Sequence, residues 1–146
     1  MYNFRLFEPK DMFSVIKIAS DNLSERYDPS IFNYFFETFP QGFLVATFAQ
    51  KIIGFIIGIE IETNKAKIVM LSISEDFQGK KIGSKLLKTF EDNLKLQKIN
   101  NIELEVRTNN KKAINFYIRH DYKIIEKVDE YYQNNESAFI MKKTNL

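Results

Sequence analysis

Apolar positions recur along the chain with two different periods, and these periods predict its helices and strands. Residues 2–7 alternate between apolar and polar side chains, which is typical of a strand. Residues 9–23 then keep one apolar face at helical spacing, starting from Pro9, and proline is tolerated in a first helical turn. Asp28 and Pro29 are typical of the N-cap and first residue of a second helix. Its apolar side, which we interpret mainly as core, holds Phe32, Phe35, Phe36 and Phe39.

Apolar runs in the middle of the chain indicate strands that are joined by short turns. Residues 43–48 and 52–59 are two such runs, and only residues 49–51 connect them, which predicts an antiparallel hairpin. A second turn at residues 63–65 leads into a further strand at residues 66–73. The middle of the chain therefore predicts three consecutive strands.

The second half returns to alternating helices and strands. A helix is expected up to about Gln97, and a strand follows at residues 102–107, where aliphatic and charged side chains alternate strictly. Another helix follows residues 108–110, and strands are expected at residues 122–128 and 138–142. The order βααβββαβαββ predicts one α/β domain spanning residues 1–146, a three-layer α/β/α fold around a mixed, mostly antiparallel sheet.

The stretch at residues 71–88, L-S-I-S-E-D-F-Q-G-K-K-I-G-S-K-L-L-K, joins a buried strand to a helix through a short loop. The first N–H groups of a helix lack partners within the helix and form an anion site with the positive end of its dipole. Gly79 and Gly83 allow close approach of a ligand, and four lysines add positive charge. The spacing differs from that of the nucleotide P-loop and of the dinucleotide fingerprint. An ordinary solvated helix start is the alternative interpretation.

Composition and charge exclude several classes of function. Twenty-one basic and nineteen acidic residues give a net charge of +2, which does not call for a nucleic-acid partner. Cysteine is absent, which excludes disulfides, thiolate metal sites and a cysteine nucleophile, and the single histidine, His120, cannot form a metal site alone. We interpret His120 as a residue at a helix C-terminus. No apolar run reaches membrane-spanning length, and the chain begins with a strand-like pattern instead of a signal peptide, so we expect a cytoplasmic protein.

The loop Q-G-K-K-I-G at residues 78–83 resembles the pyrophosphate loop of the GCN5-related N-acetyltransferase (GNAT) family, whose pattern is [Q/R]-x-x-G-x-[G/A]. Gln78 and Gly83 match its first and last positions. Lys81 replaces the usual middle glycine, and its side chain either crowds a diphosphate or contacts it. The order of predicted elements is also that of the family, so the resemblance covers essentially the whole chain.

Three further motifs resemble the N-terminal acetyltransferase branch of that family, typified by the RimI-like ribosomal-protein alanine acetyltransferases. L-E-V-R at residues 104–107, followed by Asn110, Ala113 and Tyr117, is similar to L-E-V-R-x-x-N-x-x-A-x-x-x-Y. Tyr131-Tyr132 and the segment at residues 136–141 are similar to the branch's terminal Y-Y-x-x-x-E-D-A-x-x-M, with Ser137 in place of the aspartate. N-L-S-E-R-Y at residues 22–27 resembles N-L-P-E-N-Y of archaeal and eukaryotic members.

The resemblance implies direct attack of an amine on the thioester of acetyl-CoA, without a metal. It implies Glu105 as general base, acting through water, and Tyr117 as general acid near the sulfur. The implied cofactor-binding residues are Leu71, Ser72, Ile73, Gln78, Gly79, Lys80, Lys81, Ile82, Gly83, Ser84, Asn110 and Tyr117. The implied substrate-binding residues are Glu25, Tyr27, Tyr131 and Tyr132.

Each of these residues also has a simpler interpretation. Glu105 fits a solvated strand face on which it pairs with Arg107, and Tyr117 fits a helix residue that extends its hydroxyl to water. Tyr131 and Tyr132 fit residues that fasten a loop.

Three functions are consistent with these motifs. The leading hypothesis is a peptide Nα-acetyltransferase that acts on protein N-termini with acetyl-CoA. The second is acetylation of a small amine such as a polyamine, an amino acid or an aminoglycoside. The third is a CoA-binding sensor without turnover. The sequence leaves open the preferred N-terminal residues, and whether the chain forms a homodimer or takes an auxiliary subunit.

Overall fold

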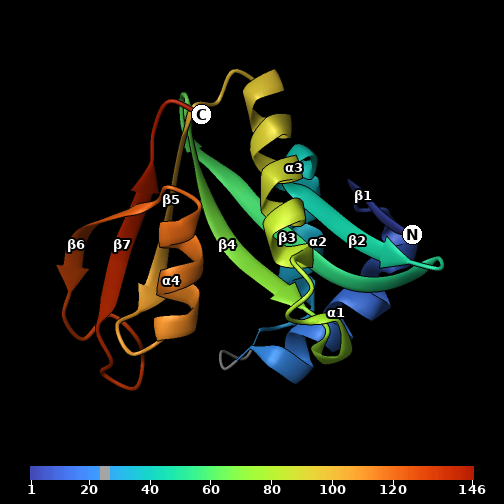
Figure 1. The fold of residues 1–146 in the computed structure, drawn as a ribbon, viewed down its shortest axis with the longest axis horizontal. Coiled ribbons are helices and arrows are strands. Elements are labelled where there is room, and N and C mark those ends of the chain that lie inside the picture. Colours follow the sequence, from blue (N-terminus) through green and yellow to red (C-terminus); the bar gives the residue numbers. More distant parts are fainter. Residues whose placement is uncertain (24–26) are drawn as a thin grey trace.

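A mixed sheet runs through the protein in the strand order β1-β2-β3-β4-β5-β7-β6 (Figure 1). The computed structural model describes residues 1–23 and 27–146. Neighbouring strands are antiparallel except β4 and β5, which are parallel. The strands are β1 (Tyr2–Leu6), β2 (Phe43–Phe48), β3 (Lys51–Glu62), β4 (Lys65–Ile73), β5 (Asn101–Arg107), β6 (Lys123–Val128) and β7 (Ala138–Lys143).

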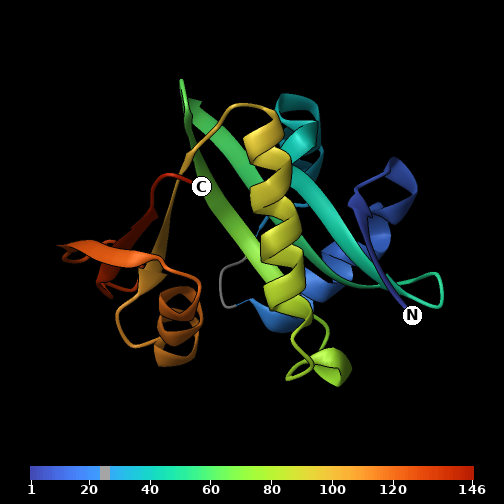
Figure 2. The same ribbon diagram turned by 45° about the horizontal axis from the view of Figure 1, so that its top comes forward.

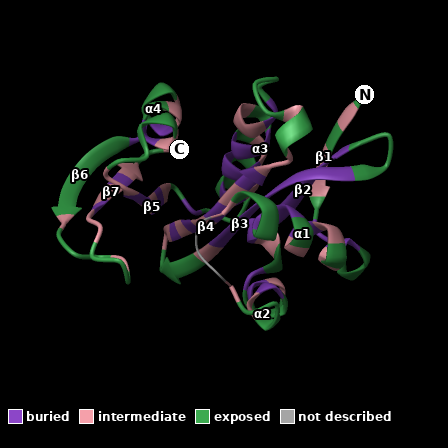
Figure 3. Ribbon diagram, turned by 90° about the horizontal axis from the view of Figure 1, so that it is seen from below, coloured by how far each residue is buried: buried purple, intermediate pink, exposed green. Residues whose placement is uncertain are grey.

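Helices cover both faces of this sheet, which confirms the three-layer prediction. They are α1 (Met12–Asn22), α2 (Ser30–Thr38), α3 (Ile82–Leu96) and α4 (Lys111–Arg119). Helices α3 and α4 lie on one face, and α1 and α2 lie on the other (Figures 2 and 3). The element order is the predicted one. Of the helices in the described ranges, none is long and apolar enough to cross a bilayer.

Two hydrophobic clusters hold the layers together. On one face Leu86 and Phe90 of α3 are buried in a cluster with Ile56 of β3. On the other face Phe32 of α2 is buried in a cluster with Phe55 of β3. Neighbouring residues of β3 therefore face opposite layers, as the period of a strand requires. Each fully buried side chain of this size contributes about 1.5–3 kcal/mol relative to exposure.

The first two helices begin later than the sequence predicts. A 3₁₀ turn at Pro9–Asp11 precedes α1, and the buried carboxylate of Asp11 accepts the Glu8 N–H at 2.9 Å and two bonds from Arg5 at 2.8 and 3.0 Å. This bound carboxylate ends the turn and starts α1 at Met12. Helix α2 begins at Ser30, whose N–H donates to Asp28 Oδ1 at 2.9 Å, so the helix starts one residue later than predicted.

The turn between β2 and β3 is tighter than predicted. Ala49 and Gln50 have φ angles of 50° and 66°, as in the two-residue hairpin turns whose twist matches the flanking strands. Lys51 is therefore the first residue of β3, and not part of the connection.

The parallel strands β4 and β5 pair over a short distance and then separate (Figure 1). Their register joins Lys65 to Asn101, Ala66 to Ile102 and Lys67 to Glu103, and helix α3 provides the connection between the strands. The paired register ends there, although β4 continues to Ile73 and β5 to Arg107. Predicted site residues lie on both strands beyond the paired register: residues 71–73 on β4 and Glu105 on β5.

Candidate active site

Two adjoining cavities lie along the separation of β4 and β5. The first has a volume of about 410 Å³ and the second of about 630 Å³. Tyr27 and Phe35 line only the first cavity, and residues of α3 line only the second. The residues that line both cavities are Leu23, Leu71, Asn110, Ala113 and Tyr117. A ligand in one cavity therefore borders directly on a ligand in the other.

The first cavity combines apolar walls with a few polar side chains. Val69 and Met70 of β4 face it together with Tyr27, and Tyr131 and Tyr132 line it from the segment between β6 and β7. Three of the four predicted substrate-binding residues thus meet in one cavity. The fourth, Glu25, lies outside the described residues. This mixture of apolar walls and few polar groups is typical of ligand sites in proteins.

Glu105 lies on the wall of the first cavity, with 12 % of its side chain exposed. Its Oε1 is 2.5 Å from Nζ of Lys67 and accepts a hydrogen bond of 2.6 Å from the Tyr131 hydroxyl. This bond to Glu105 is the main cause of a raised pKa at Tyr131, with burial second. Glu105 therefore belongs to a cavity cluster and not to a solvated strand face, and its cation is Lys67, which sequence reasoning missed.

Arg107 binds the segment that carries the two tyrosines. Its Nη1 donates to Oε1 of Glu136 at 2.5 Å, and its guanidinium carbon lies 3.9 Å from the ring centre of Tyr132. Glu136 also accepts bonds of 2.6 Å from Asn109 and Asn134. These bonds, that of Asn134 first, lower the pKa of Glu136. The network ties the segment before β7 to the end of β5 and so positions Tyr132 beside the cavity.

Tyr117 is a buried residue of α4 at the junction of the two cavities, with 7 % of its surface exposed. Its ring contacts the rings of Phe116 and Tyr122 at centroid distances of 5.1 and 5.4 Å. Burial raises the pKa of its phenol. The interpretation of Tyr117 as a surface residue that extends its hydroxyl to bulk water is therefore wrong. At the junction it is a protonated hydroxyl, available as a donor at neutral pH.

The predicted anion loop lines the second cavity. Gly79 has a φ of 78° and Lys81 a φ of 64°, so two left-handed residues bring the chain into α3. Lys81 adopts this conformation although it is not glycine. Gln78 uses its side chain to donate to the Ile73 carbonyl at 2.9 Å, which holds the loop against the end of β4. The loop therefore offers the N-terminus of α3 to the cavity.

Most of the predicted cofactor-binding residues meet around this second cavity. Those that line it are Leu71, Ser72, Ile73, Gln78, Gly79, Lys81, Ile82, Gly83, Ser84, Asn110 and Tyr117. Lys80 is not among them, and its ammonium lies 5.6 Å from the ring centre of Phe77. The side chain of Asn110 caps α4 by accepting the Ala113 N–H at 3.2 Å. Asn110 therefore caps α4 and also lines both cavities.

Asn22 is a residue of this site that sequence reasoning missed. Its Nδ2 donates to Ser72 Oγ at 3.0 Å and to the Ile73 carbonyl at 2.8 Å. These bonds fix the last residues of β4 to the end of α1. Asn22 was visible only as the first letter of the N-L-S-E-R-Y motif, without a contact to suggest its role.

His120 follows α4 as its C-cap residue, which confirms the interpretation from the sequence. Within the described ranges, no group of three or more potential metal ligands comes together.

Comparison with known proteins identifies the family and the fold. Residues 12–122 match the acetyltransferase (GNAT) family. The chain belongs to the GNAT family. A GNAT relative, an uncharacterized N-acetyltransferase of Methanocaldococcus jannaschii, is 31 % identical over 138 residues, covering 94 % of this chain and 88 % of the relative. An N-alpha-acetyltransferase of Sulfolobus acidocaldarius is 26 % identical over 155 residues, covering 96 % and 90 %.

Solved GNAT structures agree in fold. Ard1 from Thermoplasma volcanium superposes with a TM-score of 0.95 at 32 % identity, covering 99 % of this chain and 98 % of that one. Chaetomium thermophilum Naa20 in complex with a bisubstrate analogue gives a TM-score of 0.85 at 25 % identity, covering 97 % and 86 %. The predicted GNAT-like fold is confirmed.

Proposed function

We propose that the protein transfers the acetyl group of acetyl-CoA to the N-terminal α-amine of peptides or proteins. The observation that carries the proposal is the meeting of two cavities at Tyr117, with Glu105 on the wall of the first. Relatives named N-alpha-acetyltransferases support the choice of substrate. The proposal treats residues 1–146 as one catalytic domain in the cytoplasm, where acetyl-CoA and new protein N-termini are both present.

The second cavity fits the diphosphate and arm of acetyl-CoA. Gly79 and Lys81 turn the backbone so that the N-terminus of the 15-residue helix α3 borders the cavity, which favours an anion there. A Cβ added at Gly83 meets nothing closer than 3.6 Å, so the loop leaves room beside its helix. The cavity then continues along Leu71, Ser72 and Ile73 of β4 towards Tyr117. The cavity thus runs from an anion site at the start of α3 along β4, and this course matches the anionic diphosphate and the extended arm of acetyl-CoA.

Glu105 and Tyr117 divide the proton transfers between them. Acetyl-CoA supplies the acetyl group as a thioester and leaves as CoA thiol. Glu105, directly or through one water, takes a proton from the amine as its nitrogen forms the bond to the acetyl carbon. Tyr117 donates its proton to the sulfur as the carbon–sulfur bond breaks. The phenol stays protonated until that moment, because its ordinary pKa of about 10 already lies well above neutral pH and burial raises it further.

An α-amine suits this site better than a lysine side chain does. The pKa of an α-amine lies near 8 and that of a lysine ammonium near 10.4, so at neutral pH far more of the α-amine is already neutral (both values approximate). Tyr131 and Tyr132 place two phenols at the first cavity, where they are positioned to bind the first peptide units. The apolar wall at Tyr27 and Phe35 would take the first side chain.

Mass spectrometry of a peptide with one free α-amine and one internal lysine tests the proposal. We expect acetylation at the α-amine, accompanied by one equivalent of free CoA thiol. Predominant acetylation of the lysine contradicts the choice of amine. Turnover with spermidine but not with peptide supports the small-amine alternative. Binding of acetyl-CoA without release of thiol supports the sensor.

A further inference from the structure

Two ion pairs cross from β4 to β5 on the same face of the sheet. Lys65 Nζ lies 2.6 Å from Oε1 of Glu103, and Lys67 Nζ lies 2.5 Å from Oε1 of Glu105. In the backbone register, Lys65 is opposite Asn101 and Lys67 is opposite Glu103. Each lysine therefore reaches two residues further along β5 than its own partner. The two pairs therefore have the same cross-strand offset and lie two residues apart along each strand.

Their positions relative to the active site differ. The paired register of β4 and β5 ends at Lys67 and Glu103. Glu105 lies beyond that end, where β5 has separated from β4, so the Lys67 side chain spans the start of the gap. Lys67 and Glu105 both line the first cavity, whereas Lys65 and Glu103 do not. The Lys65–Glu103 pair thus lies at the paired part of the two strands, and the Lys67–Glu105 pair lies at the first cavity.

The donors to Glu105 hold one of its two oxygens. Lys67 and the Tyr131 hydroxyl both contact Oε1, from β4 and from the segment between β6 and β7. Two donors on one oxygen restrict the rotation of the carboxylate. Tyr132 and Arg107 also line this cavity. Of these neighbours, Lys67 is the cation in direct contact with the Glu105 carboxylate in the described structure.

We propose that Lys67 is a positioning residue for acetyl transfer: it orients the Glu105 carboxylate, and its charge makes the site select the neutral amine. This inference rests on the proposed function. A carboxylate alone would stabilise the substrate as an ammonium, which has no lone pair for attack. The positive charge of Lys67 opposes a second cation beside Glu105. The amine therefore binds in the form that reacts.

Replacing Lys67 by methionine tests this role, because methionine keeps an unbranched side chain of nearly the same length and removes the charge. Without the cation, nothing opposes the ammonium form of the bound amine beside Glu105, so the acidic limb of the kcat profile moves to higher pH. We expect kcat at neutral pH to fall on the order of tenfold, less than the roughly 10²–10⁴-fold that a group transferring the proton itself contributes. The peptide KM should change less. Lys67→Arg should restore much of kcat and the position of the limb.

Lys65→Met is the control, because it removes the equivalent cross-strand ion pair outside the cavity, together with the contact of Lys65 with Glu62 at 3.6 Å. It should leave kcat and the pH profile at wild-type values. Carbon-13 NMR of the Glu105 carboxyl, assigned with Glu105→Gln, gives a readout that does not need turnover. We expect the carboxyl resonance at neutral pH to move in Lys67→Met, which loses the direct contact, and to stay at its wild-type position in Lys65→Met.

Equal kcat and equal pH profiles in the two methionine variants would overturn the proposal, since Lys67 would then be a structural cross-strand pair only. An unchanged Glu105 carboxyl resonance in Lys67→Met would overturn it as well. If Lys67→Met does not fold, the same NMR measurement on Lys67→Gln and Lys67→Arg decides. Absence of peptide acetylation by the wild-type protein is a failure of the proposed function instead, and the NMR measurement distinguishes the two cases.

Discussion

The hydroxyl of Ser84 lies 2.9 Å from Nε2 of His120, and this contact joins the first turn of α3 to the end of α4. The imidazole also packs against the ring of Phe116 at a centroid distance of 4.7 Å. Burial lowers the pKa of His120, and the charges of Glu91, Lys143, Arg119 and Asp121 modify this effect. The contact links the anion loop to the helix that carries Tyr117, so the two walls of the second cavity share a titratable group.

The first prediction concerns the effect of pH on stability. Since the His120 pKa is lower in the folded protein than in the unfolded chain, the unfolded chain binds more protons below about pH 6.5. The contribution of His120 to the free energy of unfolding is therefore complete above that pH, and it is lost as the pH falls through the His120 pKa of the folded protein. Urea unfolding at pH 7.5 and 5.5 should show a smaller pH-dependent loss of free energy for His120→Gln than for the wild type. Equal losses in the two proteins would show that His120 does not contribute.

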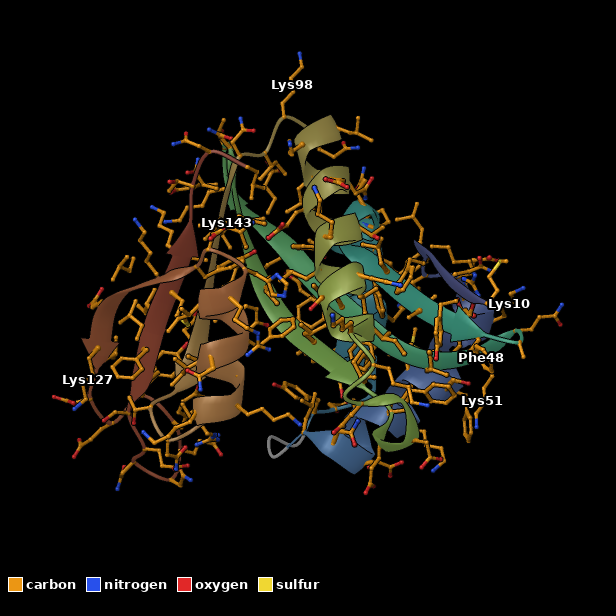
Figure 4. The ribbon with its side chains drawn as sticks, viewed as in Figure 1. Lys10, Phe48, Lys51, Lys98, Lys127 and Lys143 are labelled. Atoms are coloured by element: carbon orange, nitrogen blue, oxygen red, sulfur yellow. The ribbon has the colours of Figure 1, made fainter. Side chains whose placement is uncertain are left out.

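The second prediction concerns a buried carboxylate on α3. Glu91 has 7 % of its side chain exposed, accepts a bond of 2.8 Å from the Tyr122 hydroxyl and lies 3.1 Å from Nζ of Lys143. Lys143 extends from β7 towards α3 (Figure 4). Breaking a buried pair by removing one partner typically costs about 3–5 kcal/mol. Because Lys143 is 20 % exposed, we expect Lys143→Met to lower the free energy of unfolding by about 3 kcal/mol.

Lys88→Met is the control on the same helix. Lys88 pairs with Asp92 at 2.7 Å, and both side chains are mostly exposed, at 67 % and 54 %. Exposed pairs of this kind contribute little, so no measurable loss of stability is expected. Equal losses for the two variants, measured by urea unfolding, would contradict the assignment of the Glu91 pair as a structural link between α3 and β7.

The sequence predicted the elements well because the patterns that define them are local. The alternation at residues 102–107 identified β5, and helical spacing identified α3. Prediction was less accurate at helix starts and turns, where a single contact decides the boundary. The Asp11 carboxylate displaced the start of α1, and the left-handed Ala49 and Gln50 shortened the first hairpin turn.

Contacts between distant segments were beyond sequence reasoning. Glu105 was proposed from a motif, and Arg107 was the cation considered for it because it lies two residues away. Lys67 is 38 positions earlier, and its contact with Glu105 depends on the parallel register of β4 and β5. The bonds from Asn22 to the end of β4 depend in the same way on how α1 packs. No local pattern contains this information.

The third prediction concerns the two residues proposed for proton transfer. Tyr117→Phe removes one hydroxyl and keeps the ring contacts with Phe116 and Tyr122, so the fold should survive. We expect kcat to fall about 10²–10⁴-fold, with the affinity for acetyl-CoA nearly unchanged. Glu105→Gln should lower kcat and flatten the acidic limb of its pH profile. Wild-type turnover of peptide by both variants would rule out this mechanism.

The fourth prediction concerns Lys81, the residue that departs from the family's loop pattern. Its φ of 64° is left-handed, which costs a side chain roughly 1–2 kcal/mol, whereas glycine adopts it freely but loses more entropy on folding. We expect Lys81→Gly to stabilise the protein by a net amount on the order of 0.5–1 kcal/mol. Calorimetry with acetyl-CoA then gives the role of the side chain: tighter binding means that it crowds the loop, and weaker binding means that it contacts phosphate.

Lys98→Gly is the matched control for Lys81. Lys98 has a φ of 63°, and it lies just after α3 at the end of the helix far from the loop (Figure 4). Because glycine adopts the same left-handed conformation freely, Lys98→Gly should gain a similar amount of stability, measured by thermal unfolding. The affinity of Lys98→Gly for acetyl-CoA should equal that of the wild type. A change in affinity in Lys98→Gly would show that helix stability, and not the Lys81 side chain, controls binding.

The last prediction separates the fold of the anion loop from its function. A Cβ at Gly83 would contact Phe116 at 3.6 Å and Ile73 at 3.8 Å, which are ordinary distances, whereas a Cβ at Gly58 would meet Phe90 at 2.4 Å. Gly83 lies in the first turn of α3, where a negative charge stabilises a helix. Gly83→Asp should therefore fold at least as stably as the wild type while it repels the diphosphate.

We expect the affinity of Gly83→Asp for acetyl-CoA to fall on the order of tenfold or more, which corresponds to about 1.4 kcal/mol. Gly83→Asn has the same size and no charge, so it separates the effect of bulk from the effect of charge. A smaller loss of affinity in Gly83→Asn assigns the remainder to repulsion of the diphosphate. Calorimetry and thermal unfolding of both variants provide the measurement. Unchanged affinity in Gly83→Asp, in a protein that folds normally, would move the cofactor away from the N-terminus of α3 and leave the second cavity without its proposed occupant.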